Sequence, residues 1–408
     1  MPFIMITVLI DMLSIGLIVP VLPALVGRFT GSQADQVFWY GVVTLTFSLA
    51  NFFASPILGA LSDAHGRRPV LLAGFCGVAL SFFATGMATA LWVLIAVRVV
   101  SGAMQSNAAV ANAYVADISA PEQRAKRFGM LGAMFGIGFI LGPVMGGLLG
   151  NIDLQLPFFV SGALALTNLA YGWFVLPESL PPEKRRPFAW KAANPLVSLR
   201  ALARLKGVGM LAASLACSGL AQFILYTCWV LYSTFKFGWG PAENGWSLAA
   251  VGVMSVIVQG VLLGRLLKRF SPQRLAVMGL VSSTLAYALW GAATEGWMMF
   301  AVIFANVLGF AVQASMQSII SSAADESNQG QTMGAVSGLS SLMAVVAPVI
   351  GAPLLGIVSH LPRGDWRIGA PLYFCAALQF AALVIAWLHF RKARLARPAV
   401  AHPTASSV

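Results

Sequence analysis

The chain has 408 residues, of which 59% are hydrophobic and only 9% are charged, and its mean hydropathy is +0.83. A soluble domain carries about 25% charged residues, so this composition excludes a soluble fold and makes lipid the solvent for most of the surface. The net charge of +12 would favour nucleic-acid binding in a soluble protein. Here the basic residues stand in short loops between apolar runs, so we expect a lipid bilayer and no nucleic acid as partner.

Twelve apolar runs are long enough to cross a bilayer core of about 30 Å, which needs roughly 20 helical residues. The backbone in lipid must satisfy its own hydrogen bonds, so all twelve are predicted to be helices. The first run lacks a preceding basic region, so we interpret it as a span and not as a signal peptide. The predicted spans are 3–27, 38–59, 69–87, 91–115, 127–150, 155–176, 208–232, 243–264, 273–293, 297–320, 331–357 and 370–390.

The longest loop is basic and rich in proline, and it divides the chain after the sixth span. This organisation predicts an all-α integral membrane protein with twelve transmembrane helices in two bundles of six. The predicted units are an N-terminal bundle (1–176), a cytoplasmic linker (177–207), a C-terminal bundle (208–390) and a basic cytoplasmic tail (391–408).

Loop charge predicts the orientation. Most of the 25 basic residues fall in loops on the side of both termini and the linker, whereas Arg28, Lys236, Arg363 and Arg367 fall on the other side and Arg98 lies within a span. We therefore expect both termini in the cytoplasm and a bacterial-type inner membrane location.

An internal repeat supports the division into halves. At an offset of 205 residues four landmarks coincide: Gly59 with Gly264, Gly129 with Gly334, Pro143 with Pro348, and Gly146 with Gly351. Repeated six-helix halves are typical of the major facilitator fold.

The loop after the second span reads Gly59-Ala-Leu-Ser-Asp63-Ala-His-Gly66-Arg67-Arg68. It resembles the GxxxDRxGRR signature of the major facilitator superfamily, with Ala64 in place of the usual basic residue. The resemblance implies a conformational latch, in which Asp63 faces the start of span eleven, whose positive dipole end attracts a carboxylate. It also implies that Arg67 pairs with Asp117, so that the two halves are held closed on the cytoplasmic side.

Two further motifs lie in spans four and five. Arg98-Val-Val-Ser-Gly102 looks like the RxxxG motif of the family. Span five is similar to the GxxxGPxxGG motif of its drug:proton antiporters, through Gly138, Gly142, Pro143, Gly146 and Gly147. Small residues there also serve helix packing, and we expect these residues to contact span eight.

The resemblance is closest to the tetracycline-efflux branch and covers nearly the whole chain. Two departures from that branch concern acidic residues. Its pumps carry an Asp in span three, where this chain has Ser81, and another in span nine, where residues 280–290 contain no acid. Both losses count against transport of a tetracycline–metal complex.

Away from the ends of the predicted spans there are only two charged residues, Asp11 and Arg98. A charge at the centre of a span costs about 2.5–3.5 kcal/mol on insertion scales and therefore marks function. Counting 1.5 Å per residue, their depths differ by roughly 8 Å, which two side chains could largely bridge. We interpret Asp11 as the proton carrier, with Arg98 modulating its protonation; a static ion pair between the two is the alternative.

The rest of the cavity is predicted to be neutral and aromatic, as ligand sites commonly are. The side chain of each candidate could equally form a hydrogen bond between helices instead of contacting a ligand. The candidates are Asn51, Gln105, Asn107, Asn112, Gln222, Tyr226, Trp229, Gln259, Asn306, Gln313 and Gln317.

Other classes of protein fit the sequence less well. The four histidines form no ligand cluster and no GxSxG or HExxH pattern occurs, so we expect neither an enzyme nor a metal site. No nucleotide-binding loop is present, so the proton gradient is the expected energy source, without a cofactor. The sequence favours a monomeric, proton-coupled antiporter that exports a small amphipathic compound. A proton-coupled carrier or exchanger of a metabolite or siderophore-like solute remains the alternative.

Overall fold

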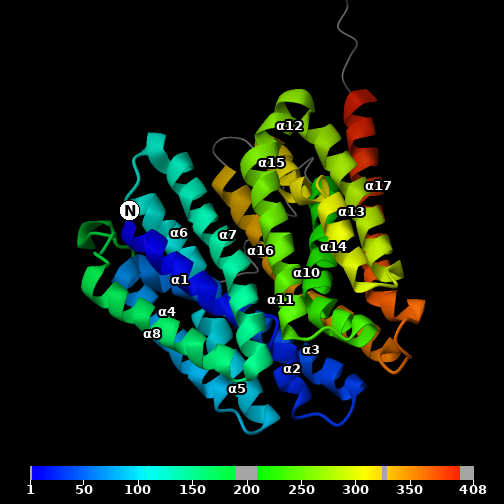
Figure 1. Ribbon diagram of the computed structural model, residues 1–408. Helices are drawn as coiled ribbons and strands as arrows, with labels where there is room; N and C mark the ends of the chain where they lie inside the picture. The colour runs from blue at the N-terminus through cyan, green and yellow to red at the C-terminus, as the bar shows by residue number, and fades with distance from the viewer. Residues whose placement is uncertain (1, 106, 189–208, 324–328, 396–408) are drawn as a thin grey trace, which may run out of the picture.

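The computed structural model describes residues 2–105, 107–188, 209–323 and 329–395. Within these residues the fold is entirely helical, and two bundles stand side by side (Figure 1). The rest of the linker (189–208) and of the tail (396–408) lies outside the described residues, as does the side chain of Asn107.

The N-terminal bundle contains the first six spans. Two of them are interrupted: span one at Pro20, which lacks the amide hydrogen that continues a helix, and span four after Met104. Its helices are α1 (Pro2–Ile18), α2 (Leu22–Gly27), α3 (Gln33–His65), α4 (Arg67–Gly86), α5 (Leu91–Met104), α6 (Asn107–Asp117), α7 (Pro121–Ile152) and α8 (Leu156–Val175), followed by the short 3-10 helix η1 (Pro182–Lys184) in the linker.

The C-terminal bundle contains the remaining spans. Span eight passes through a π-helical turn, and span twelve is preceded by a 3-10 helix. Its helices are α10 (Gly209–Phe237), α11 (Pro241–Ile257), η2 (Val258–Leu262), α12 (Leu263–Arg269), α13 (Pro272–Ala292), α14 (Gly296–Ala305), η3 (Gly309–Ala311), α15 (Val312–Ala323), α16 (Gln329–Val358), η4 (Trp366–Gly369) and α17 (Ala370–Leu395).

Eleven helical segments among the described residues are long and apolar enough to cross a membrane. The tenth predicted span is not one straight helix, because α14 and α15 meet at a 54° bend. Asn306 ends α14, and its side chain accepts a hydrogen bond from Ser282 Oγ (2.9 Å) instead of leaving the break unsatisfied. With the bent pair counted as one, the twelve predicted spans are all present.

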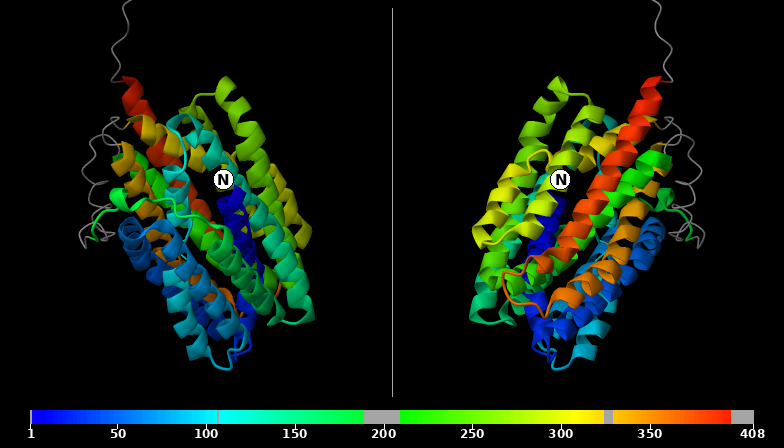
Figure 2. Two further views of the ribbon diagram at one scale, coloured as in Figure 1. Left: turned by 90° about the vertical axis from the view of Figure 1, so that its left-hand side faces the viewer. Right: turned by 90° about the vertical axis from the view of Figure 1, so that its right-hand side faces the viewer.

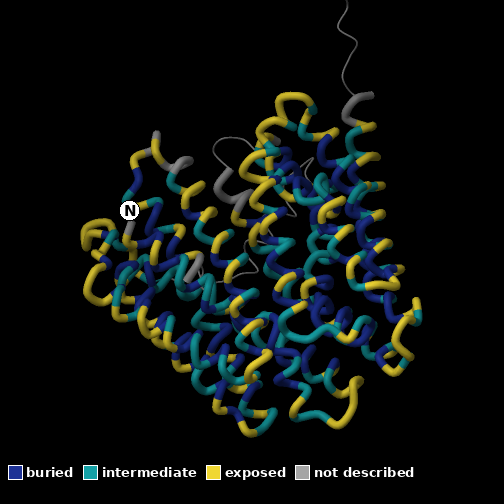
Figure 3. Tube along the Cα trace, in the orientation of Figure 1, coloured by how far each residue is buried: buried dark blue, intermediate teal, exposed yellow. Residues whose placement is uncertain are grey.

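Many residues on the outer faces of the helices are exposed (Figure 3), and a large number of them are large and apolar. Phe174 is 83% exposed, Ile152 77% and Trp92 72%. Water would make such a surface prone to aggregation, whereas lipid solvates it. The exposed surface therefore agrees with a multi-pass membrane protein.

The molecule has two ends that differ in packing. We call the end with the α3–α4 turn and the start of the linker the linker end, and the end with the α7–α8 and α10–α11 turns the opposite end. In Figures 1 and 2 the linker end is at the top.

At the opposite end the two halves share one apolar core. It includes Val37 and Tyr40 of α3, Ile224 of α10 and Ala352 of α16. A hydrogen bond from the amide of Ala242 to Asn151 Oδ1 (3.3 Å) joins α11 to α7 across the halves.

At the linker end the core divides into separate clusters. One contains Leu71 and Val115 of the N-terminal half, and another contains Leu211 and Ile320 of the C-terminal half. Glycines near this end on facing helices have open space beside them: Gly59, Gly129, Gly132, Gly260, Gly264 and Gly334. The structure is therefore closed at the opposite end and open at the linker end.

The repeat is visible in helix packing. A Cβ at Gly146 of α7 would meet the backbone of Leu17 in α1, and one at Gly351 of α16 would meet Ile224 in α10. The fifth span of each half thus packs against the first span of the same half at an equivalent glycine.

The predicted orientation leads to a labelling experiment. In a background without other cysteines, Gly31→Cys in the α2–α3 turn should react with a membrane-impermeant maleimide in intact cells. Glu183→Cys in η1 should react only after permeabilisation, because the linker end is predicted to face the cytoplasm. The reverse labelling pattern would overturn the orientation.

Candidate functional site

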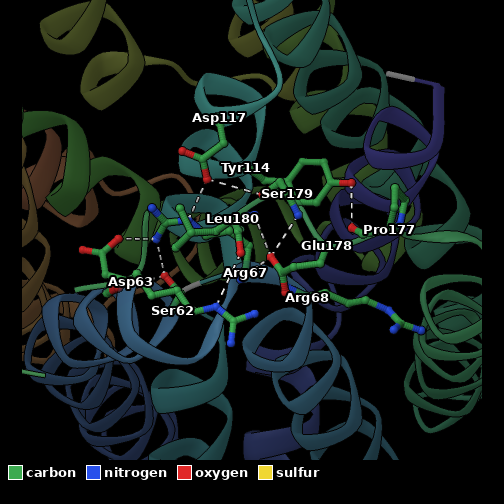
Figure 4. A network of polar contacts seen from close by, with 12 residues as sticks. Ser62, Asp63, Arg67, Arg68, Tyr114, Asp117, Pro177, Glu178, Ser179 and Leu180 are labelled. Atoms are coloured by element: carbon green, nitrogen blue, oxygen red, sulfur yellow. Dashed lines mark hydrogen bonds and ion pairs between the residues drawn. The ribbon is translucent and has the colours of Figure 1, made fainter. Parts of the chain in front are cut away.

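Glu178 of the linker caps the N-terminus of α4 (Figure 4). Its carboxylate accepts hydrogen bonds from the backbone amides of Arg67 (2.8 Å) and Arg68 (3.2 Å), and from those of Ser179 and Leu180. A carboxylate at a helix N-terminus satisfies free N–H groups and meets the positive end of the helix dipole. Because the cap comes from 110 residues away in sequence, it ties the start of the linker to the α3–α4 turn.

Gly66 is the residue that makes this turn possible. Its φ of +102° and ψ of 159° are backbone angles essentially restricted to glycine. A Cβ at this position would also collide with the Glu178 carboxylate. Two structural features therefore require glycine at this position of the motif: its backbone conformation and the close approach of the Glu178 carboxylate.

Arg67 is buried and holds two acidic residues. Its Nη1 lies 2.6 Å from Asp63 Oδ1 and its Nε lies 3.0 Å from Asp117 Oδ2. Ser62 Oγ accepts a further hydrogen bond of 2.6 Å. The pairing of Arg67 with Asp117, implied by the family resemblance, is present.

This network does not bridge the two halves in this conformation. All its described members belong to α3, α4, α6 and the linker, and Asp63 points at Arg67 (Figure 4). The first side chains of α16 lie outside the described residues, so the contact expected between Asp63 and span eleven is not observed.

The glycine motif of α7 faces two helices. Gly138, Gly142 and Gly146 contact Met12, Gly16 and Leu17 of α1, so close that a Cβ would collide with the α1 backbone or with a Cβ. On the other side, the carbonyl of Pro143 lies against Gly245 of α11, and Gly147 lies against Pro241. The sequence predicted only the second contact, with span eight.

Asp11 and Arg98 are both buried, at 6% and 4% exposure, and they are not paired. Asp11 lies in a small apolar pocket inside the N-terminal half, lined by Val8, Leu71, Phe135 and others. No cation lies within 4 Å of its carboxylate among the described residues. The static ion pair considered as the alternative is therefore not formed in this conformation.

Arg98 of α5 lies within electrostatic range of Tyr40 of α3. Its Nε is buried and has no hydrogen-bond partner among the described residues. The sequence predicted that Asp11 and Arg98 lie at similar depths in the membrane. Depth alone does not specify the direction in which each helix presents its side chain.

One cavity of about 290 Å³ lies almost wholly in the C-terminal half. It collects six of the predicted cavity residues, which come from α10, η2 and the α14–α15 bend: Gln222, Tyr226, Trp229, Gln259, Asn306 and Gln313. Gln222 donates a hydrogen bond to the Tyr226 hydroxyl (2.8 Å), and Trp229 and Trp290 meet edge to face at 5.2 Å. No lining residue carries a charge.

Asn51, Gln105 and Asn112 of the N-terminal half are not among the residues that line this cavity. Asn51 donates to the carbonyl of Gly102 (3.2 Å) and so joins α3 to α5, while Gln105 follows the last residue of α5. Gln317 is also absent from the lining. Asn51 therefore forms an interhelical hydrogen bond, which was the alternative considered for each cavity candidate.

The sequence reasoning missed several polar lining residues, namely Ser255, Ser283, Tyr287, Ser340 and Gln379. Ser283 and Tyr287 fall in the stretch 280–290, which was noted for its lack of an acid. A periodic polar face on α13 could have indicated them. No cluster of metal-ligating side chains occurs among the described residues, so the cavity offers hydrogen bonds and aromatic surface only.

Comparison with known proteins identifies relatives along nearly the whole chain. The family model described as Major Facilitator Superfamily matches residues 4–348 and 211–405. The tetracycline resistance protein of class C from Escherichia coli is 36% identical over 371 residues, which is 90% of this chain and 92% of that protein. The class D protein from Salmonella ordonez is 34% identical, with coverage of 90% and 92%.

Solved structures agree on the fold. The human organic anion transporter MFSD10 (TETRAN) superposes with a TM-score of 0.71 at 21% identity, covering 94% of this chain and 98% of that chain. The nucleoside transporter NupG gives a TM-score of 0.77 at 12% identity, with coverage of 95% and 98%.

The α3–α4 turn provides a stability test. Gly66→Ala should lower the free energy of unfolding by about 1–3 kcal/mol, because alanine strains the backbone there and collides with Glu178. Gly59→Ala is the matched control: this glycine is helical and has open space, so alanine should be neutral or stabilising by up to about 1 kcal/mol. Thermal unfolding of both variants in detergent measures the difference, and equal melting temperatures would contradict the assignment.

Proposed function

Since the chain belongs to the Major Facilitator Superfamily, we propose that it exports a small amphipathic aromatic compound in exchange for protons, by alternating access. The observation that carries this proposal is the separation of two sites. A neutral cavity lies in the C-terminal half, and a buried carboxyl without a cation lies in the N-terminal half. The first suits a ligand and the second suits a proton.

The chemistry of the cavity supports an uncharged or internally neutral ligand. Amide and hydroxyl groups can donate and accept hydrogen bonds, and the indoles of Trp229 and Trp290 and the ring of Tyr287 offer flat apolar surface. A ligand with a bare positive charge would find no carboxylate in the lining to compensate its desolvation. We therefore propose a planar, polar but neutral compound, rather than a metal complex of the kind that acidic residues would hold.

The surroundings of Asp11 support its role as proton carrier. A carboxylate in an apolar pocket, with no cation or hydrogen-bond donor beside it among the described residues, is costly, and binding a proton removes that cost. In this conformation the linker end is open. Closure of that end and opening of the other would change the surroundings of Asp11, which is the condition for exchanging a proton between the two sides.

Asp11→Asn should abolish compound-dependent proton movement into liposomes, reducing it to the level of protein-free vesicles, because asparagine cannot carry the proton. Compound exchange without a pH gradient should survive, which separates loss of coupling from loss of folding. Asp35→Asn, at the exposed start of α3, is the matched control and should behave as the wild type. Proton-coupled transport by Asp11→Asn would remove this residue from the mechanism.

Gln222→Leu should weaken the binding of aromatic ligands about fivefold. The substitution preserves volume but removes one neutral hydrogen bond worth about 1 kcal/mol. Quenching of tryptophan fluorescence measures the affinity, since Trp229 and Trp290 line the cavity. Gln155→Leu, in the turn before α8, is the control, and equal affinities in all three proteins would place the ligand elsewhere.

A further inference from the structure

A groove of about 880 Å³ runs between α4 and α8 on the outer face of the N-terminal half. The two helices lie on the side of the molecule away from the C-terminal half (Figure 1). Exposed alanines, Ala73 and Ala170, line the groove together with larger apolar side chains, among them Leu72 and Leu169. Small residues on both helices are what leaves room for a ligand between them.

The linker end of the groove carries a positive charge. The Arg68 side chain extends away from the ionic network of Arg67 (Figure 4) and lines the groove. Its Nη2 donates to the carbonyl of Trp173 (2.5 Å), whereas its Nε is buried and has no partner in the described parts of the chain. No carboxylate lies within 4 Å of the guanidinium among the described residues.

The acid beside the start of α4, Glu178, forms no ion pair with the Arg68 guanidinium. Glu178 accepts hydrogen bonds from four backbone amides, those of residues 67, 68, 179 and 180, and is thereby committed to the start of α4. Arg68 therefore has donor capacity left for an external anion, and no free acid stands beside it to attract an ammonium group.

The depth of the groove suits a lipid. Trp173 is 61% exposed and Phe174 83% exposed at the linker end of α8, where aromatic residues mark the boundary between headgroups and hydrocarbon. From Arg68 the groove follows α4 to Cys76, eight residues or about 12 Å into the apolar layer. The charged end of the groove at the membrane interface matches a phospholipid headgroup, and the apolar channel below it matches an acyl chain.

We propose that this groove binds a phospholipid with an anionic headgroup, its phosphate on Arg68 and one acyl chain between α4 and α8. A basic pocket between transmembrane helices is the chemistry that recognises such headgroups. A free phosphate could bind Arg68 but would make no favourable contact with the apolar part of the groove. A second copy of the chain, docked by two-fold symmetry on this face, would bring two uncompensated Arg68 charges together.

The test is native mass spectrometry of the purified full chain, titrated with phosphatidylglycerol and phosphatidylcholine of identical acyl chains. The wild type should retain one phosphatidylglycerol with at least about a tenfold preference, since charge-assisted hydrogen bonds are involved. Arg68→Gln should abolish the preference, and Arg68→Lys should keep part of it. Arg274→Gln, an exposed arginine at the start of α13, is the charge-matched control and should match the wild type.

A second variant probes the channel without touching the charge. Ala170→Phe should fill the groove and reduce retention of both lipids, and inorganic phosphate should not displace the bound lipid from the wild type. Equal retention of the two lipids by the wild type, an unchanged preference in Arg68→Gln, or unchanged retention in Ala170→Phe would each overturn the proposal. So would efficient cross-linking between two copies through Cys76, in a variant that keeps only this cysteine, because the groove would then be a protein interface.

Discussion

A side chain at Gly142 would meet the Cα of Gly16 at 2.7 Å, and similar collisions await a side chain at Gly138 or Gly146. Because the backbones of α7 and α1 are in direct contact, the two helices cannot move closer together at this interface. On its other side α7 meets α11 through Pro143 and Gly147. Because close-packed interfaces tend to have discrete arrangements instead of deforming continuously, α7 belongs rigidly to its own half and forms, with α11, the seam at which the halves meet.

The glycines that recur in the two halves differ in how they are packed. Gly146 and Gly351 fill equivalent roles within their halves, but no described side chain from another element packs against Gly59, Gly129, Gly264 or Gly334. A helical glycine without a packing reason costs about 1 kcal/mol relative to alanine. Under the proposed alternating access, these four residues lie where the halves would pack when the linker end closes, which explains glycine at sites that look unconstrained here.

The sequence predicted those parts of the structure that depend on residue type alone. The spans follow from apolar length, whereas the motif around Gly66 and the pairing of Arg67 with Asp117 were implied by the family resemblance. It failed where the direction of a side chain matters: Asp11 and Arg98 have comparable depth but face different helices, and Asn51 is committed to the carbonyl of Gly102. It also placed cavity residues in both halves, because composition shows which side chains are polar but not which face the same space. The bend between α14 and α15 was not predicted, because Asn306 and Gly309 at the break stand in a run that is otherwise apolar and long enough for one span.

The distance between the carboxyl and the cavity raises the question of how one could affect the other. Phe135 of α7 lines the pocket of Asp11, and Phe139, one helical turn further, lines the cavity of the C-terminal half. Between them Gly138 packs against Met12, the neighbour of Asp11, while Gly136 lies against Val256 of α11. If Asp11 is the proton carrier, as proposed, α7 is a single helix that touches both its pocket and the cavity, so coupling between the two requires no chain of polar groups. The close packing of α7 on α1 makes the contact between α7 and α11 the place where we expect a change at Asp11 to produce movement.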